Sequence, residues 1–158
     1  MPATLRAAEA RDVPAIVGLI GELAEFEKLT HLLEVTPQSL HPHLFGPHPV
    51  AEALVAEHDA QLIGFALFFT SFSTFLGKPG LYLEDLYVQP AHRGAGVGRA
   101  LLMRLAALAN ERGHGRFEWS VLDWNEGAIR FYQRLGATLL PDWRLCRVSG
   151  EALRRLAG

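Results

Sequence analysis

Two neighbouring carboxylates, Glu84 and Asp85, interrupt an otherwise apolar run of residues that ends at Val88. A carboxylate in such surroundings can accept a proton from a nucleophile or hold a cationic substrate. In a regular strand, successive side chains face opposite sides, so the two carboxylates cannot both point to one side. The simpler alternative is that one faces solvent and the other forms an ion pair with an arginine.

A glycine-rich segment follows this run directly, at residues 89–99. Gly94, Gly96 and Gly98 alternate along it, with Arg93 and Arg99 on either side. Glycines let a backbone approach a ligand closely, and the start of a following helix adds N–H groups and the positive end of its dipole. The segment is therefore suited to a phosphate or pyrophosphate, and the alternative is a turn whose glycines only allow tight packing.

Two phosphate-binding motifs are excluded by spacing. The dinucleotide motif G-x-G-x-x-G/A requires a small residue where this chain has Arg99 or Leu101. The mononucleotide loop requires Ser or Thr after Gly-Lys, and the Gly77-Lys78 pair is followed by Pro79. The pattern that remains is Arg93-x-x-Gly96-x-Gly98.

The elements that must position these residues follow from hydrophobic periodicity and turn signals. We expect a first helix capped by Asp12 with Pro14 in its first turn, a helix from Val97 that ends at Gly113, and a helix over 125–135. Residues 36–49 are predicted to form a loop with one short helix. Strands are predicted at 5–8, 51–56, 61–70, 80–88, 116–122 and 143–148. This order indicates one α/β domain over residues 1–158, with helices on both faces of a mixed sheet.

Composition narrows the functional classes. The formal net charge is −2, which argues against a protein that coats nucleic acid. Residues 1–92 carry 4 basic and 11 acidic residues, whereas residues 93–158 carry 11 and 6, so two ligands of opposite sign are indicated. A single cysteine, Cys146, and the absence of an apolar leader or membrane-length segment predict a cytoplasmic protein without membrane attachment. His41, His43 and His48 lie among prolines without ligand spacing, so we expect no metal site.

The pattern Arg93-x-x-Gly96-x-Gly98 after a strand resembles the pyrophosphate-binding signature of the GNAT N-acetyltransferases. Residues 22–27, 82–88, 124–126, 131–137 and 143–145 are similar to the diamine acetyltransferase branch, which includes spermidine/spermine and thialysine N-acetyltransferases. The resemblance covers essentially the whole chain. It implies a mixed β-sheet flanked by helices on both faces, acetyl-CoA as cosubstrate, and a homodimer.

The resemblance also implies roles for individual residues. Glu84 would accept the amine's proton and Tyr132 would protonate the departing sulfur, although Tyr132 could equally be a core aromatic. Asn125 would bond the pantetheine, cap its helix, or do both. The residues expected to bind acetyl-CoA are Leu86, Tyr87, Val88, Arg93, Gly94, Ala95, Gly96, Val97, Gly98, Arg99, Asn125 and Tyr132. Those expected to bind the amine are Phe26, Glu27, Glu84, Asp85 and Asp142.

Two departures from the polyamine enzymes affect the expected acceptor. Phe26 stands where those enzymes commonly have Tyr, and residues 139–143 keep one acidic residue, Asp142. A diamine, a polyamine, or thialysine or another lysine-like amino acid therefore remains open as the acceptor. The alternatives are a protein lysine or N-terminus as acceptor, and a regulatory module that binds CoA without catalysis.

Overall fold

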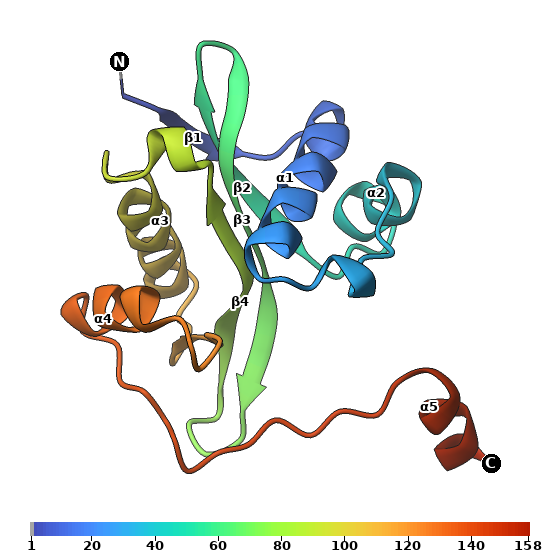
Figure 1. Ribbon diagram of the computed structural model, residues 1–158. Helices are drawn as coiled ribbons and strands as arrows, with labels where there is room; N and C mark the ends of the chain where they lie inside the picture. The colour runs from blue at the N-terminus through green and yellow to red at the C-terminus, as the bar shows by residue number, and fades with distance from the viewer. Residues whose placement is uncertain (1) are drawn as a thin grey trace. The chain divides into compact units, whose positions relative to one another are not determined.

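The computed structural model describes residues 2–158. The chain forms two compact units, and the boundary between them follows Ser120. The first unit is built on five strands in the order β1-β2-β3-β4-β5 (Figure 1). They are β1 (Thr4–Ala7), β2 (Glu52–His58), β3 (Gln61–Ser73), β4 (Lys78–Val88) and β5 (Phe117–Trp119). Neighbouring strands are antiparallel except β4 and β5, which run parallel, so the predicted mixed sheet is confirmed.

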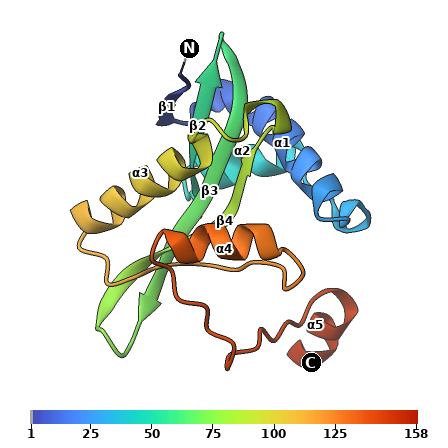
Figure 2. The ribbon, with the colours of Figure 1, turned by 60° about the vertical axis from the view of Figure 1, so that its left-hand side comes forward.

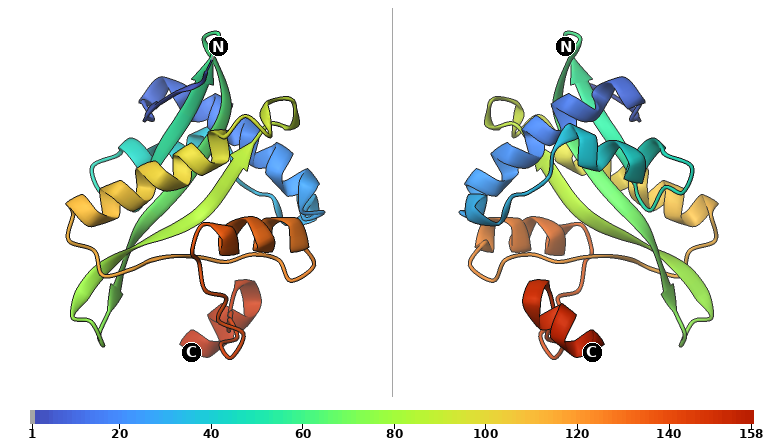
Figure 3. Two further views of the ribbon diagram at one scale, coloured as in Figure 1. Left: turned by 90° about the vertical axis from the view of Figure 1, so that its left-hand side faces the viewer. Right: turned by 90° about the vertical axis from the view of Figure 1, so that its right-hand side faces the viewer.

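Helices cover both faces of this sheet, as predicted. Helix α3 (Val97–Glu111) crosses one face, and α1 (Val13–Phe26) and α2 (Pro37–Phe45) cross the other (Figure 3). On the α1 side, Ile16 and Leu19 pack with Val55, Phe65 and Leu67, which alternate along β2 and β3. A short 3₁₀ turn precedes each of the three helices. These turns are η1 (Ala10–Asp12) before α1, η2 (Thr30–Leu32) before α2 and η3 (Pro90–His92) before α3.

The start of α1 corrects one prediction in detail. Asp12 stands at the N-cap position, but its carboxylate caps no α1 amide. It accepts hydrogen bonds from both terminal nitrogens of Arg6, at 2.7 and 3.0 Å, and from the Glu9 N–H. Because Arg6 lies on β1, this pairing connects the start of the helix to that strand. The same arginine also bonds Glu57 on β2.

An irregularity in β4 determines where its carboxylates point. Leu67 of β3 pairs with Asp85, whereas the next residue, Phe68, pairs with Leu83, so Glu84 is an extra residue on β4. Such a β-bulge reverses the facing of the residues on its two sides. Figure 2 shows β4 as the second arm of the long β3–β4 hairpin that contains this bulge.

The second unit contains two helices, α4 (Glu126–Arg134) and α5 (Gly150–Ala157). The Asn125 side chain accepts a hydrogen bond from the Ala128 N–H at 3.3 Å, which confirms the predicted cap. The predicted strand at 143–148 is wrong: these residues are exposed and have no regular structure, and Cys146 is exposed with them. Their apolar residues favour a strand, but a strand also needs a neighbour that supplies ladder hydrogen bonds.

Other boundaries differ by smaller amounts. The predicted strand at 116–122 shortens to β5. The short helix predicted within residues 36–49 is confirmed as α2, whose N-terminus is capped reciprocally by Thr36 and Ser39. Within residues 2–158, no helix combines the length and hydropathy that a membrane span requires.

Candidate active site

The glycine turn has the geometry of an anion site. Gly94 and Gly96 both have φ of 83°, and a Cβ built on either would meet no atom within 4 Å. Gly96 is the N-cap of α3, and the first hydrogen bond of the helix runs from the Ala100 N–H to the Gly96 carbonyl at 2.9 Å. The N–H groups of Val97 and Gly98 therefore have no acceptor within the helix, and they mark its positive end. An open turn at the start of a helix can bind an anion.

The end of β4 beside the turn has an unpaired edge. The Gln89 N–H donates to the Ile63 carbonyl of β3, and hydrogen-bonded pairs alternate along an antiparallel ladder. The backbone groups of Leu86 and Val88 therefore point away from β3, toward the side of β5. On that side β5 pairs with β4 only as far as Leu83. Leu86 and Val88, two residues predicted to bind acetyl-CoA, therefore have backbone groups on this side that form no ladder hydrogen bonds with another strand within residues 2–158.

Three of the residues predicted to bind the amine come together. Glu27 follows the last residue of α1, and both Glu27 and Glu84 repel the Asp85 carboxylate electrostatically. Burial and these two charges raise the pKa of Asp85 to about 6, and burial also raises the pKa of Glu27. Glu84 is exposed on the bulge, whereas Asp85 is half-buried. Three carboxylates that act on one another through their charges can attract a positively charged group.

The raised pKa of Asp85 gives a stability prediction. The native state holds the Asp85 proton more tightly than the unfolded chain does, so stability falls as pH rises from 3.8 to about 6. Asp85→Asn removes this penalty. We expect it to raise the free energy of unfolding at pH 7.5 by at most about 3 kcal/mol, with the difference vanishing toward pH 4.

Urea unfolding at pH 4, 5, 6 and 7.5 measures the effect. Glu34→Gln makes the same chemical change at an exposed position, and we expect it to be neutral at every pH. A gap between Asp85→Asn and the parent protein that stays constant across this range would contradict the prediction.

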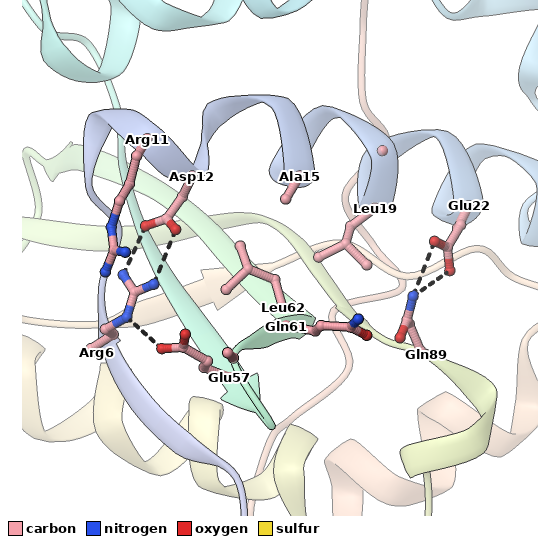
Figure 4. Close-up of a pocket in the computed structure, with 12 residues that line it drawn as sticks. Arg6, Arg11, Asp12, Ala15, Leu19, Glu22, Glu57, Gln61, Leu62 and Gln89 are labelled. Carbon is pink, nitrogen blue, oxygen red and sulfur yellow. Dashed lines mark hydrogen bonds and ion pairs between the residues drawn. The ribbon is translucent and has the colours of Figure 1, made fainter.

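A second cluster joins α1 to the region just before the glycine turn. The Tyr87 hydroxyl donates to Glu22 at 3.1 Å, and the Gln89 amide donates to both oxygens of Glu22, at 3.2 and 3.4 Å (Figure 4 shows Glu22 and Gln89). The guanidinium carbon of Arg93 lies 5.2 Å from the centre of the Phe26 ring and 5.4 Å from that of Tyr87. Its Nε donates to the Val88 carbonyl at 2.9 Å. The Arg93 side chain is therefore held between two aromatic rings.

Sequence reasoning missed Glu22 and Gln89 as members of this cluster. Glu22 and Phe26 are four residues apart, so they lie on the same side of α1. This spacing could have indicated that Glu22 and Phe26 act together. Their partners come from β4 and the segment after it, which only the fold brings close to α1.

Two hollows adjoin these clusters. A groove of about 500 Å³ lies along α1, lined partly by Glu22, Gln89 and Leu19 (Figure 4). It contains none of the predicted site residues, and the Arg6, Asp12 and Glu57 charges on its wall are paired with one another. A smaller hollow of about 170 Å³ is lined by Ala95, Gly96 and Val97 of the turn. We place the candidate active site at the glycine turn and the three carboxylates, because the groove along α1 is lined by neither of them.

The remaining predicted residues belong to the second unit. Tyr132 is half-buried on α4, and its ring centre lies 5.5 Å from that of Phe131. Asn125 caps the same helix, and Asp142 lies in an exposed turn. Among the residues described, no group of three or more His, Cys, Asp and Glu side chains could hold a metal ion.

Known proteins match both the sequence and the fold. The model of the acetyltransferase (GNAT) family matches residues 20–137. The thialysine N-epsilon-acetyltransferase of Mus musculus is 38% identical, over 98% of this chain and 96% of its own length. The L-ornithine N5-acetyltransferase of Arabidopsis thaliana is 34% identical, over 96% of this chain and 86% of its own length. An integron cassette protein of V. cholerae superposes with a TM-score of 0.83 at 25% identity, covering 99% of this chain and 98% of that one.

The family match spans the glycine turn, the unpaired end of β4 and the two adjacent carboxylates, and it extends through α4. The matched range includes every predicted site residue except Asp142. With relatives that are 38% and 34% identical over nearly the whole chain, this protein belongs to the acetyltransferase (GNAT) family and is an N-acetyltransferase.

Proposed function

We propose that this protein transfers an acetyl group from acetyl-CoA to the primary amine of a small cationic molecule, and that residues 1–158 act as one acetyltransferase domain. The observation that carries the proposal is the cluster of Glu27, Glu84 and Asp85 at the end of α1 and the bulge of β4. The charges of Glu27 and Glu84 raise the pKa of Asp85, and a positively charged ligand would relieve that repulsion.

The glycine turn and the end of β4 would hold the cosubstrate. N–H groups at the start of α3 would bind the pyrophosphate, and Arg99 would add positive charge from the first turn of the helix. The backbone of Leu86 and Val88, which β5 does not pair, would bond the pantetheine arm, and the Val88 N–H would serve there because its carbonyl already accepts from Arg93. Asn125 would also contribute. Acetyl-CoA supplies a thioester whose carbonyl carbon an amine can attack.

Side chains of the protein would then transfer two protons, one from the amine and one to the departing sulfur. A primary amine has a pKa of about 10 in water, so it must lose a proton before it attacks. Glu84, exposed on the bulge, would accept that proton directly or through water, while Asp85 and Glu27 hold the cation. The nitrogen–carbon bond forms as the carbon–sulfur bond breaks, and the Tyr132 hydroxyl would protonate the sulfur. In this scheme both substrates are bound together and the amine attacks directly.

The acceptor is a small amine with a second polar group. The relatives named above are a thialysine and an ornithine acetyltransferase, whose named substrates are amino acids with a side-chain amine. Phe26, directly before Glu27, lacks the hydroxyl that the polyamine enzymes commonly have at this place, which weakens the case for a long polyamine.

An amine panel tests the proposal. Thiol release from acetyl-CoA is measured with thialysine, L-ornithine, L-lysine, putrescine and spermidine, and with a lysine-containing peptide of neutral net charge. We expect the compact amines to give a kcat/KM at least about tenfold above that of the peptide. Preference for the peptide would favour a protein acceptor, and tight CoA binding without thiol release would indicate a regulatory module.

The resemblance to the diamine acetyltransferases further leads us to propose a homodimer. Analytical ultracentrifugation at micromolar concentration measures the mass directly, and a monomer would contradict this proposal.

A further inference from the structure

The Arg93 side chain connects two parts of the molecule that the proposed reaction uses separately. Its backbone begins the glycine turn, whereas its guanidinium lies between the rings of Phe26 on α1 and Tyr87 on β4. Planar guanidinium groups stack favourably on aromatic faces, and the Nε bond to the Val88 carbonyl fixes the plane of the group. The side chain is thereby directed to the end of α1 that precedes Glu27.

The end of α1 is a short, sharply turned segment. The Glu27 N–H donates to the Leu23 carbonyl at 2.9 Å, and the Leu29 N–H reaches back to the Ala24 carbonyl at 2.8 Å. Between them Lys28 has φ of 61°, a conformation that is unfavourable for a residue with a side chain. A segment of this kind keeps its shape only when the surrounding contacts hold it.

Two such contacts come from residues 87–93, on the side of the glycine turn. Glu22 is bonded by Tyr87 and Gln89, and Phe26, one helical turn further along, packs against Arg93. The last turn of α1 is thus held at two points by residues 87–93, which lead from β4 into the glycine turn. Glu27 comes directly after the second of these points, so its place beside Asp85 depends on them.

We propose that Arg93 is a positioning residue for the amine site: its side chain holds the end of α1, and with it Glu27, against β4. This inference rests on the proposed function for its kinetic test. It gives the first residue of the glycine motif a role toward the amine in addition to the predicted role of the turn toward acetyl-CoA.

Arg93→Met, Arg93→Lys and the control Arg104→Met test it. Arg104 lies on the exposed side of α3, and its loss removes the same charge away from the cluster. With the best amine of the panel, we expect Arg93→Met to raise the KM for the amine about tenfold. The KM for acetyl-CoA should stay within about twofold and kcat within about threefold. Arg93→Lys, which keeps the charge but loses the planar donor, should have a smaller effect of about threefold, and Arg104→Met none.

Hydrogen–deuterium exchange supplies a readout that does not need activity. The amides of residues 24–29 should exchange about tenfold faster in Arg93→Met than in the parent protein and the Arg104→Met control. Unchanged exchange there, or a raised KM for acetyl-CoA with an unchanged KM for the amine, would overturn the inference. If the parent protein acetylates no amine, the proposed function fails, and the exchange experiment still decides the role of Arg93.

Discussion

Replacing Tyr132 by Phe is expected to lower kcat about a hundredfold while the dissociation constant of acetyl-CoA stays within about twofold. Proton transfer by a positioned general acid typically contributes at least about a hundredfold to the rate, and this substitution removes one hydroxyl. The aromatic ring is kept, so its packing with Phe131 on α4 is preserved. Steady-state kinetics with the best amine and calorimetric titration with acetyl-CoA measure the two quantities.

Tyr82→Phe is the matched control. Tyr82 is also half-buried, and its hydroxyl shares a hydrogen bond of 2.8 Å with Ser120. Removing that hydroxyl should leave kcat within about twofold. A Tyr132→Phe enzyme that keeps kcat within about threefold of the parent value would show that the sulfur is protonated by another group.

Gly96→Ala is expected to weaken acetyl-CoA binding ten- to hundredfold. The new Cβ would enter the open space over the turn, where we place the pyrophosphate, and φ of 83° disfavours any residue with a side chain. A hydrogen bond to a charged group contributes about 1.5–3 kcal/mol, so displacing the phosphate from one or two N–H groups accounts for this range. Calorimetry at fixed ionic strength measures the dissociation constant.

Gly113→Ala separates the ligand effect from backbone strain. Gly113 follows the other end of α3, its φ is 71°, and a Cβ built on it also meets no atom within 4 Å. Both substitutions should lower the stability by about 1–2 kcal/mol, because both force alanine into the left-handed region. Only Gly96→Ala should affect acetyl-CoA, and equal affinities in the two variants would contradict the assignment of the turn.

Periodicity and turn chemistry predicted most of the elements of the first unit. Continuous apolar runs in β2 and β3 and the helical spacing of Leu101 and Leu105 in α3 are local signals that the packing later reinforces. The prediction of a strand at 143–148 was wrong because it rested only on the apolar residues of that segment. In the described chain no neighbouring strand pairs with that segment, and helix α5 beyond it was not predicted at all.

The site was predicted in its parts but not in its assembly. The glycine turn and the Glu84–Asp85 pair stand out because their residue types are unusual for their context. The bulge cannot be read from the sequence, since it depends on how β3 and β4 register with each other. The guanidinium of Arg93 lies near the rings of Phe26 and Tyr87, two residues that only the tertiary fold brings to it.

The extra residue in β4 constrains how this protein can diverge. Leu83 and Asp85 sit two positions apart yet face opposite sides of the sheet, because Glu84 stands unpaired between them. Deleting one residue here would turn either the apolar stretch before it or the carboxylate after it to the wrong side. Descendants of this sequence can therefore exchange side chains in this stretch of β4, but a change in its length would disturb either the hydrophobic core or the amine site that we propose.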